Sequence, residues 1–255
     1  MTEAVSIEHH GTVAVLTMNR PSKRNALNAE FSAELAGTLR KLQDEPTIRA
    51  LVLFGGKHFC AGGDLADLNA PVLAMRRSMQ TGQGIIRELA GGRLPAVAAV
   101  EGNAYGAGFS MALACDFVVA DKATTFCAAF GRVGLQPDYG LLWSLTQRVG
   151  IGLAREIVML CEPIPGLEAK DWGLVDRLSE KGRVLDTALE LAHRLAAAAP
   201  ATIATTKAIL SRQPLTLDSM LAWEADTQSL LLRSEDFTEG VDAFAQKRPP
   251  AFKGR

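Results

Sequence analysis

FGGKHFCAGGDL, residues 54–65, is the most informative stretch of this chain. It follows an apolar run at residues 50–54 and holds four glycines among its twelve residues. Glycine tolerates positive φ and allows another segment, or a ligand, to approach the backbone closely. An apolar run that stops in such a turn predicts a buried strand followed by a tight, glycine-rich loop.

A second stretch of the same character follows at residues 94–116, LPAVAAVEGNAYGAGFSMALACD. Its apolar start predicts a short buried strand, which runs into Gly102, Gly106 and Gly108 and then into a helix of small residues. Backbone N–H groups at a tight turn and at the start of a helix point toward any negative charge in front of them. Two such elements facing each other would form an oxyanion hole.

Length, charge and composition exclude several classes of protein. The 255 residues are 48% hydrophobic, which fits a globular chain with one large or two small cores. The net charge of −1 provides no general field for nucleic acid or acidic lipid. No apolar run approaches the ~18 residues that span a bilayer, and the first ten residues lack the features of a signal peptide. We therefore expect a cytoplasmic protein with no nucleic-acid or membrane partner.

The cysteines and histidines predict no metal site. No CxxC pair and no HExxH spacing occurs in the sequence. The four cysteines lie in apolar or small-residue surroundings, which favours a reducing compartment and a role as small buried hydrophobes. These are Cys60, Cys115, Cys127 and Cys161.

Strands alternate with helices in the first part of the chain. Alternating polarity around Gly11 predicts a hairpin, and Asn28 is a plausible N-cap for a helix with helical spacing of its apolar residues. This order of elements predicts an α/β fold with parallel strands. The expected strands are 5–9, 12–18, 48–54, 95–100 and 117–120, and the segment 67–92 is expected to be mostly helical.

From residue 141 onward the pattern is helical almost throughout. Ser234 is the expected N-cap of the last helix, whose apolar face would consist of Phe237, Val241 and Phe244. We divide the chain into an α/β core, residues 1–198, and a helical region, residues 199–255, as subdomains of one folded unit. The expected helices are 141–149, 153–160, 167–172, 183–199, 201–212, 216–232 and 234–246, with one extended piece at 174–178.

Five strings in order resemble the crotonase, or enoyl-CoA hydratase/isomerase, superfamily, over essentially the whole chain. The resemblance implies a spiral of ββα units, an active site in the core, and C-terminal helices that join protomers into trimers, commonly two trimers face to face, and cover the CoA pocket. It also implies an acyl-CoA thioester substrate, with coenzyme A as part of the substrate and no separate cofactor. The strings are NRPSKRNALN (19–28), HFCAGGDL (58–65), EGNAYGAGFSMALACD (101–116), FGRVGLQPDYG (130–140) and FTEGVDAFAQKRPPAFKGR (237–255).

By the same resemblance, two backbone amides would form the oxyanion hole. They are the N–H of Gly63, before the aspartate of the first turn, and the N–H of Ala107, at the start of the small-residue helix. Both donors are backbone groups, so alanine at 107 keeps the function. Together they would hold the thioester oxygen as it becomes an enolate, and one such donor is typically worth ~3 kcal/mol of barrier.

The resemblance also implies a set of residues along the acyl-CoA path. Lys23 and Arg24 would border the CoA diphosphate, although two solvated loop cations are an equal alternative. Phe252 and Lys253 would reach the nucleotide from a neighbouring protomer, and the aspartate of the first turn, Asp64, is usually structural. The full set expected to bind substrate or CoA is Lys23, Arg24, Ala26, Ala61, Asp64, Leu65, Gly106, Ser110, Phe130, Phe252 and Lys253.

The departures from the family pattern bear on the reaction. Hydratases of the family use two glutamates to position and activate water, and Ser110 and Phe130 stand in their places. Neither side chain exchanges protons as a carboxylate does. Asp138, in GLQPDYG, is similar to the acid/base of isomerase-type members. An N-cap or turn role is the alternative for Asp138, because it lies just before a predicted helix.

We therefore predict an acyl-CoA enzyme that moves a double bond, with Asp138 shuttling a proton and Gly63 and Ala107 stabilising the enolate. One carboxylate is enough for that shuttle if burial raises its pKa. Three alternatives stay open: a hydratase in fatty-acid or aromatic-acid degradation, an acyl-CoA hydrolase or dehalogenase with Asp138 as nucleophile, and a catalytically silent CoA-binding homologue.

Overall fold

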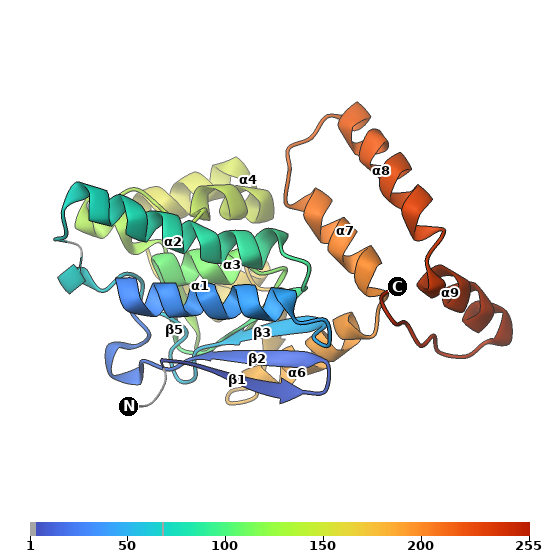
Figure 1. Ribbon diagram of the computed structural model, residues 1–255. Helices are drawn as coiled ribbons and strands as arrows, with labels where there is room; N and C mark the ends of the chain where they lie inside the picture. Colours follow the sequence, from blue (N-terminus) through green and yellow to red (C-terminus); the bar gives the residue numbers. More distant parts are fainter. Residues whose placement is uncertain (1–3, 68) are drawn as a thin grey trace.

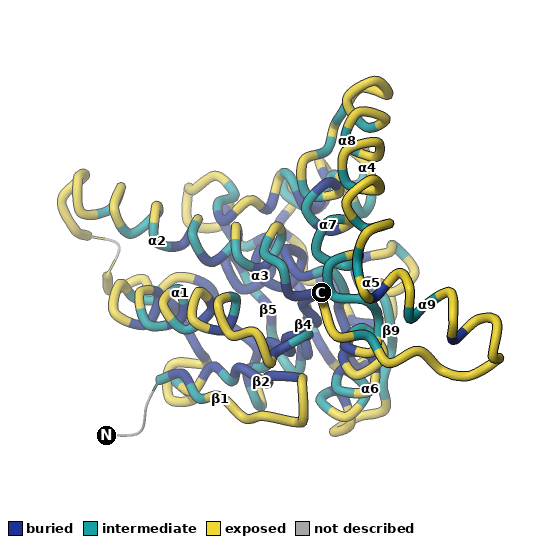
Figure 2. The backbone as a smooth tube through the Cα atoms, turned by 45° about the vertical axis from the view of Figure 1, so that its right-hand side comes forward, coloured by how far each residue is buried: buried dark blue, intermediate teal, exposed yellow. Residues whose placement is uncertain are grey.

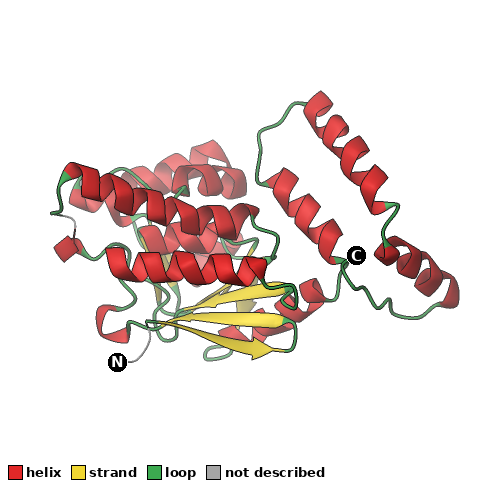
Figure 3. Cartoon of the chain, in the orientation of Figure 1, coloured by secondary structure: helices red, strands yellow, loops and turns green. Residues whose placement is uncertain are grey.

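The computed structural model describes residues 4–67 and 69–255 and has an α/β architecture (Figures 1 and 3). Its main sheet has six strands in the order β1-β2-β3-β4-β6-β9. The first two strands form the predicted antiparallel hairpin, and every later neighbour pairs in parallel, which confirms the predicted α/β class. The strands are β1 (Val5–His10), β2 (Val13–Met18), β3 (Ala50–Phe54), β4 (Ala96–Val100), β6 (Phe117–Asp121) and β9 (Arg177–Ser179).

Helices cover both faces of this sheet, so its central strands are apolar on both sides. On one face, α1, α2, α3 and α4 enclose the larger core cluster, in which Phe31, Phe109 and Leu145 are fully buried. On the other face, α6 packs its buried side chains against β2, β3, β4 and β6. The helices are α1 (Ala29–Asp44), α2 (Val72–Gly91), α3 (Ala107–Ala114), α4 (Leu141–Leu160), α5 (Gly166–Asp171) and α6 (Val184–Ala196).

Most predicted helix boundaries are confirmed. Asn28 is the N-cap of α1 and accepts a hydrogen bond from the Phe31 amide. The helical segment predicted at 67–92 begins only at Val72, and residue 68 lies outside the described residues. The two helices expected at 141–149 and 153–160 are one element, α4, interrupted at Gly150, whose φ of 73° is not helical. Glycine at that position allows the break without ending the helix.

A small second sheet, in the order β5-β7-β8, was not predicted. Its strands are β5 (Asn103–Tyr105), β7 (Thr125–Cys127) and β8 (Ile164–Pro165). Strands of two or three residues are too short to show a period in the sequence. They matter because β5 connects the second glycine-rich turn to α3, and a hydrogen bond from the Gly106 amide to the Cys127 carbonyl, 2.9 Å, holds its end against β7.

The last three helices project away from the sheet (Figure 1). They are α7 (Pro200–Leu210), α8 (Leu217–Leu231) and α9 (Glu235–Gln246). Pro200 begins α7, where its missing N–H costs nothing, and the predicted division near residue 198 falls between α6 and α7. Figure 2 shows most of α8 and α9 as exposed or intermediate. Ser234 caps α9 as predicted, accepting from the Phe237 amide.

Candidate active site

A cavity of about 290 Å³ opens where the two glycine-rich turns meet. Its walls come from the start of α1, the loop before α2, the first half of α2, the start of α3 and the segment between β7 and α4. Most of its lining atoms belong to apolar side chains. Gly63, Ala107, Phe130, Asp138 and Tyr139 all line it. The cavity therefore gathers segments that lie as much as 112 residues apart, from Leu27 to Tyr139.

The first turn presents the Gly63 amide to this cavity. Gly63 and Leu27 form a parallel β-bridge, in which the Leu27 amide donates to the Gly62 carbonyl (2.8 Å) and the Asp64 amide donates to the Leu27 carbonyl (2.7 Å). In a parallel bridge the residue between those two groups directs its own N–H to the opposite side. Within residues 4–67 and 69–255 no acceptor pairs with the Gly63 N–H. The amide is therefore free to bind a ligand.

The second turn presents the Ala107 amide. Ala107 is the first residue of α3, and Gly106 precedes it with a positive φ of 51°. The first amides of a helix have no intrahelical acceptor, and the described residues supply none for Ala107. The positive end of the short α3 dipole adds to the attraction for a developing negative charge. Two unpaired amides thus border one cavity, as an oxyanion hole requires.

Close backbone contact holds the two turns together. The Tyr105 amide donates to the Cys60 carbonyl (2.9 Å), and the Cys60 amide donates to the Asn103 carbonyl (3.0 Å). A Cβ on Gly108 would lie 2.4 Å from the Cys60 carbonyl oxygen, and one on Gly62 would lie 3.0 Å from the Tyr105 oxygen. Glycine is needed at both positions, because any side chain would push the two amides apart.

Asp138 is the carboxyl group inside the cavity. Its Oδ1 is buried and has no hydrogen-bond partner within the described part of the chain. Burial raises the pKa of Asp138 to about 6, partly opposed by a hydrogen bond from its own backbone amide. The N-cap of α4 is Gly140, and no side chain caps this helix. Asp138 therefore does not cap α4, which removes the N-cap alternative, while its carbonyl accepts the Leu141 amide (3.1 Å) in the turn that precedes the helix. A carboxyl with a raised pKa and one buried, unpaired oxygen is typical of a functional acid or base.

Tyr139 and Phe130 form part of the wall near Asp138. Both side chains are almost fully buried, and both line the cavity. Burial raises the pKa of Tyr139 to about 12, so this side chain stays neutral at physiological pH. Its ring lies against Gly82 of α2, where an added Cβ would come within 2.2 Å of the ring. Ser32 of α1 also lines the cavity. The sequence did not indicate Ser32 or Gly82, because helical spacing marks a face of a helix and not what packs on it.

The residues expected along the CoA path occupy four places. Ala61, Leu65, Gly106 and Phe130 line the cavity itself. Beside it, the Ala61 amide donates to the Arg24 carbonyl (3.0 Å), which places the loop that carries Lys23, Arg24 and Ala26 next to the first turn.

Asp64 and Ser110 lie behind this surface. Asp64 forms ion pairs with Arg20 (3.6 Å) and Lys23 (3.7 Å). Ser110 has no exposed surface and is absent from the cavity wall. Phe252 and Lys253 lie in the C-terminal tail, where the Lys253 amide donates to the Asp236 carboxylate, away from this cavity.

Two kinds of feature are absent from residues 4–67 and 69–255. No group of three or more His, Cys, Asp or Glu side chains is placed to hold a metal ion. None of the helices there combines the length and the apolar character that crossing a membrane requires.

Comparison with known proteins places the chain in a family. The sequence model described as enoyl-CoA hydratase/isomerase matches residues 8–255. The chain belongs to the enoyl-CoA hydratase/isomerase family. It is 38% identical over 251 residues to the 1,2-epoxyphenylacetyl-CoA isomerase of Escherichia coli K12, covering 95% of each chain. It is 33% identical over 265 residues to the carnitinyl-CoA dehydratase of Citrobacter koseri, covering 100% of each.

Solved structures of the enoyl-CoA hydratase/isomerase family share the fold. The crystal structure of an enoyl-CoA hydratase from Polaromonas sp. JS666 superposes with a TM-score of 0.92 at 36% identity, covering 98% of this chain and 100% of the other. The crotonase fold and an activity on CoA thioesters follow from this membership. Since the relatives include an isomerase and a dehydratase, the cavity's own residues must indicate which reaction occurs.

Proposed function

We propose that this enzyme shifts a carbon–carbon double bond in an unsaturated acyl-CoA thioester. The observation that carries the proposal is Asp138: a half-buried carboxyl, with a raised pKa and an Oδ1 that has no partner among the described residues, in the cavity that Gly63 and Ala107 border. A base that works near neutral pH needs a pKa close to that pH, and burial supplies it here.

The reaction can be written with one protein acid/base. In a 3-enoyl thioester, the ionised Asp138 takes a proton from the α carbon, and the electron pair moves onto the thioester oxygen. The amides of Gly63 and Ala107 would hold this oxygen as an enolate. The protonated Asp138 then returns a proton to the γ carbon, the double bond forms between the α and β carbons, and the carboxylate is restored. No water is consumed.

The rest of the wall favours this reaction over hydration. The cavity lining contains two carboxyl groups, Asp138 and Asp67, and Asp67 is exposed at the mouth. Phe130 presents a hydrocarbon ring to the cavity, and Ser110 lies behind the wall. Addition of water requires a second group to activate or orient it, and a dry wall supports proton transfer between carbons instead.

Proton exchange tests the proposal. In deuterated water, a 3-enoyl-CoA should become the 2-enoyl isomer with deuterium at the γ carbon, followed by NMR. Asp138→Asn keeps the shape of the side chain but removes the base, and should lower kcat by 10²–10⁴-fold. In the wild type, kcat should rise with pH around 6, where Asp138 ionises. A 2-enoyl-CoA that gains a β-hydroxyl at a comparable rate would favour the hydratase. A covalent acyl-Asp138 would favour the nucleophilic alternative.

Stability provides the control for Asp138→Asn. The folded carboxyl has a pKa of about 6 against an ordinary value of 3.8, so folding binds a proton between these values. Unfolding therefore becomes easier as pH rises from about 4 to 6, and the ionised side chain costs stability above that range. At pH 8 the free energy of unfolding of Asp138→Asn should exceed that of the wild type by roughly 1–2 kcal/mol. Lost activity with a lower melting temperature at pH 8 would instead indicate misfolding.

We also propose that the protomer assembles into a trimer or a dimer of trimers. Exposed apolar side chains on the C-terminal helices support this, since Phe244 is 88% and Leu230 is 75% exposed. Exposed apolar surface of this kind typically marks a contact with another chain.

A further inference from the structure

Ser110 contacts both the start of α3 and the turn that carries Asp138, and it does so without lining the cavity. Its side chain lies in α3 with no exposed surface. The hydroxyl is 3.0 Å from the Asp138 carbonyl oxygen and 3.3 Å from the Gly106 carbonyl oxygen. These two acceptors lie 32 positions apart in the chain. One serine thus contacts the residue before the Ala107 amide and the residue that carries the cavity's carboxyl.

The Ser110 hydroxyl could be satisfied within its own helix, without the bond to Asp138. A buried serine inside a helix ordinarily donates to the carbonyl four residues earlier, which here is Gly106. That carbonyl already accepts the Ser110 amide at 3.1 Å. The hydroxyl has one proton, and its shorter contact is to Asp138, whose carbonyl also accepts the Leu141 amide at 3.1 Å. The geometry therefore favours a bond between segments over a bond within the helix.

We propose that Ser110 is a positioning residue: its hydroxyl fastens the turn of Asp138 to the helix that begins with Ala107, and so sets the base against the oxyanion donors. This inference rests on the proposed function of those three residues. Ser110 does not touch the cavity and acts only through Asp138. Such fastening matters because a misplacement of about 1 Å at a reacting group can cost 10²-fold in rate.

The opposite side of the same turn is held by packing. Tyr139 has a left-handed φ of 49°, and its ring fills the space over Gly82. The turn is therefore clamped between α2, through Tyr139, and α3, through Ser110. Loss of the Ser110 bond leaves Tyr139 in place, so the fold is expected to persist while the Asp138 backbone gains freedom on the α3 side.

A titration experiment separates this role from a structural one. In substrate-free protein with ¹³C-labelled aspartate, the carboxyl of Asp138 is titrated by NMR in the wild type, Ser110→Ala and Ser144→Ala. The other titratable groups on the cavity wall are Tyr139 beside it and Asp67 at the mouth, and neither is altered. We expect the Asp138 pKa to fall toward its ordinary value only in Ser110→Ala, because a loosened turn admits water.

Ser144→Ala is the matched control. Ser144 is also buried and helical, and its hydroxyl bonds only to carbonyls of its own α4 turn, Gly140 and Leu141, at 3.4 Å each. Ser144→Ala therefore removes the same hydroxyl oxygen as Ser110→Ala but breaks no bond to Asp138. If Ser110→Ala does not fold, Ser110→Cys, a weak donor of similar size, replaces it in the comparison.

Kinetics on a 3-enoyl-CoA supply the second readout. Ser110→Ala should lower kcat 10- to 100-fold with KM changed less than about 2-fold, and the acidic limb of kcat should move to lower pH. Ser110→Thr, which keeps the hydroxyl, should recover part of the loss, and Ser144→Ala should behave as the wild type.

The two proposals fail in different ways. An inactive wild type, or a fully active Asp138→Asn, would overturn the proposed function. If both of those behave as expected, but Ser110→Ala keeps wild-type kcat and an unchanged Asp138 titration, the positioning role alone is overturned. Equal losses in Ser110→Ala and Ser144→Ala would also overturn it.

Discussion

The α/β core and the C-terminal helices use their apolar residues in opposite ways. All eight residues of α3 are buried, whereas none of the fifteen residues of α8 is. In Figure 2 β2, β4 and α3 are largely dark blue, the edge strands β1 and β9 are mostly yellow or teal, and α8 and α9 are mostly yellow and teal. The core buries the apolar side chains of its central strands and of α3 within the protomer. The C-terminal helices leave theirs available, which is expected of a region whose partner is another chain.

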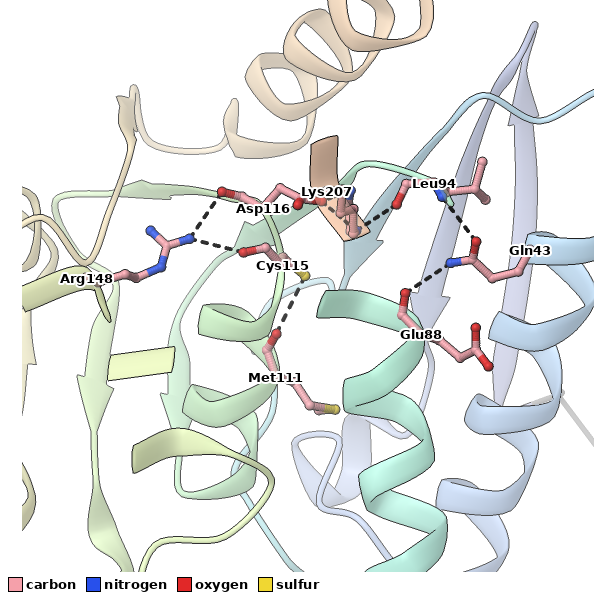
Figure 4. Close-up of polar contacts among 9 residues, drawn as sticks. Gln43, Glu88, Leu94, Met111, Cys115, Asp116, Arg148 and Lys207 are labelled. Carbon is pink, nitrogen blue, oxygen red and sulfur yellow. Dashed lines mark hydrogen bonds and ion pairs between the residues drawn. The ribbon is translucent and has the colours of Figure 1, made fainter. Parts of the chain in front are cut away.

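One polar cluster joins the two regions (Figure 4). Lys207 of α7, with a side chain only 4% exposed, forms an ion pair with Asp116 (2.6 Å) and donates to the Leu94 carbonyl (2.7 Å). Arg148 of α4 donates to the Cys115 and Asp116 carbonyls. Gln43 of α1 accepts from the Leu94 amide and donates to the Glu88 carbonyl. Lys207 is the member of this cluster that belongs to the C-terminal helices, so the joint between the two regions is its contact with the Asp116 carboxylate and the Leu94 carbonyl, after the ends of α3 and α2.

The largest contrast is expected between two phenylalanines, Phe109 in the core and Phe244 on α9. Phe109 is fully buried, with its ring 5.5 Å from that of Phe126. Phe109→Ala should lower the free energy of unfolding by about 3–5 kcal/mol at any protein concentration. Phe244→Glu should change the free energy of unfolding of the protomer by less than about 0.5 kcal/mol. It should, however, weaken the association of protomers. Urea unfolding and sedimentation measure the two.

Sedimentation of the wild type at three times the protomer mass of 27.2 kDa would support the proposed trimer. A wild-type monomer, or a trimer unaffected by Phe244→Glu, would contradict the assignment of this face.

A smaller effect is expected at the joint. Lys207→Met removes the buried cation and leaves the carboxylate of Asp116, which is 25% exposed, without its ion-pair partner. We expect a loss of about 2–4 kcal/mol, below the full cost for a completely buried pair. Hydrogen exchange should quicken in α7 before it does in β4. Arg183→Met is the control, because its pair with Asp186 is mostly exposed and is worth about 0.5 kcal/mol or less. Uniform exchange across both regions would argue against a discrete joint.

The smallest effects separate two glycines of α2. A Cβ on Gly82 would lie 2.2 Å from the ring of Tyr139, whereas nothing lies within 4 Å of one on Gly84. Gly82→Ala should cost about 1–3 kcal/mol through overpacking, and should reduce activity because Tyr139 adjoins Asp138. Gly84→Ala should stabilise the protein by about 0.5–1 kcal/mol, since alanine is the better helix former. The melting temperatures of the two variants test this prediction. Equal changes in melting temperature would show that the Tyr139 ring moves aside at little cost.

Much of the fold could be predicted because it follows local rules. The N-caps Asn28 and Ser234, the hairpin at Gly11 and the parallel strands of the main sheet are all confirmed. Side-chain period and capping chemistry depend on neighbours within one or two turns, so a single sequence displays them. The two glycine-rich turns and Asp138 could likewise be recognised as parts of a site, and the structure places them around one cavity.

Contacts between distant segments had to come from the tertiary structure. No local pattern shows that Ser110 donates to Asp138, or that Lys207 pairs with Asp116. Nor does any local pattern show that the ring of Tyr139 packs against Gly82. The short strands β5, β7 and β8 form because they pair with one another. The sequence by itself determined the helices, the strands of the main sheet and the two glycine-rich turns. Only the folded chain decided which amide, carboxyl and hydroxyl meet, because that depends on packing between residues far apart in the chain.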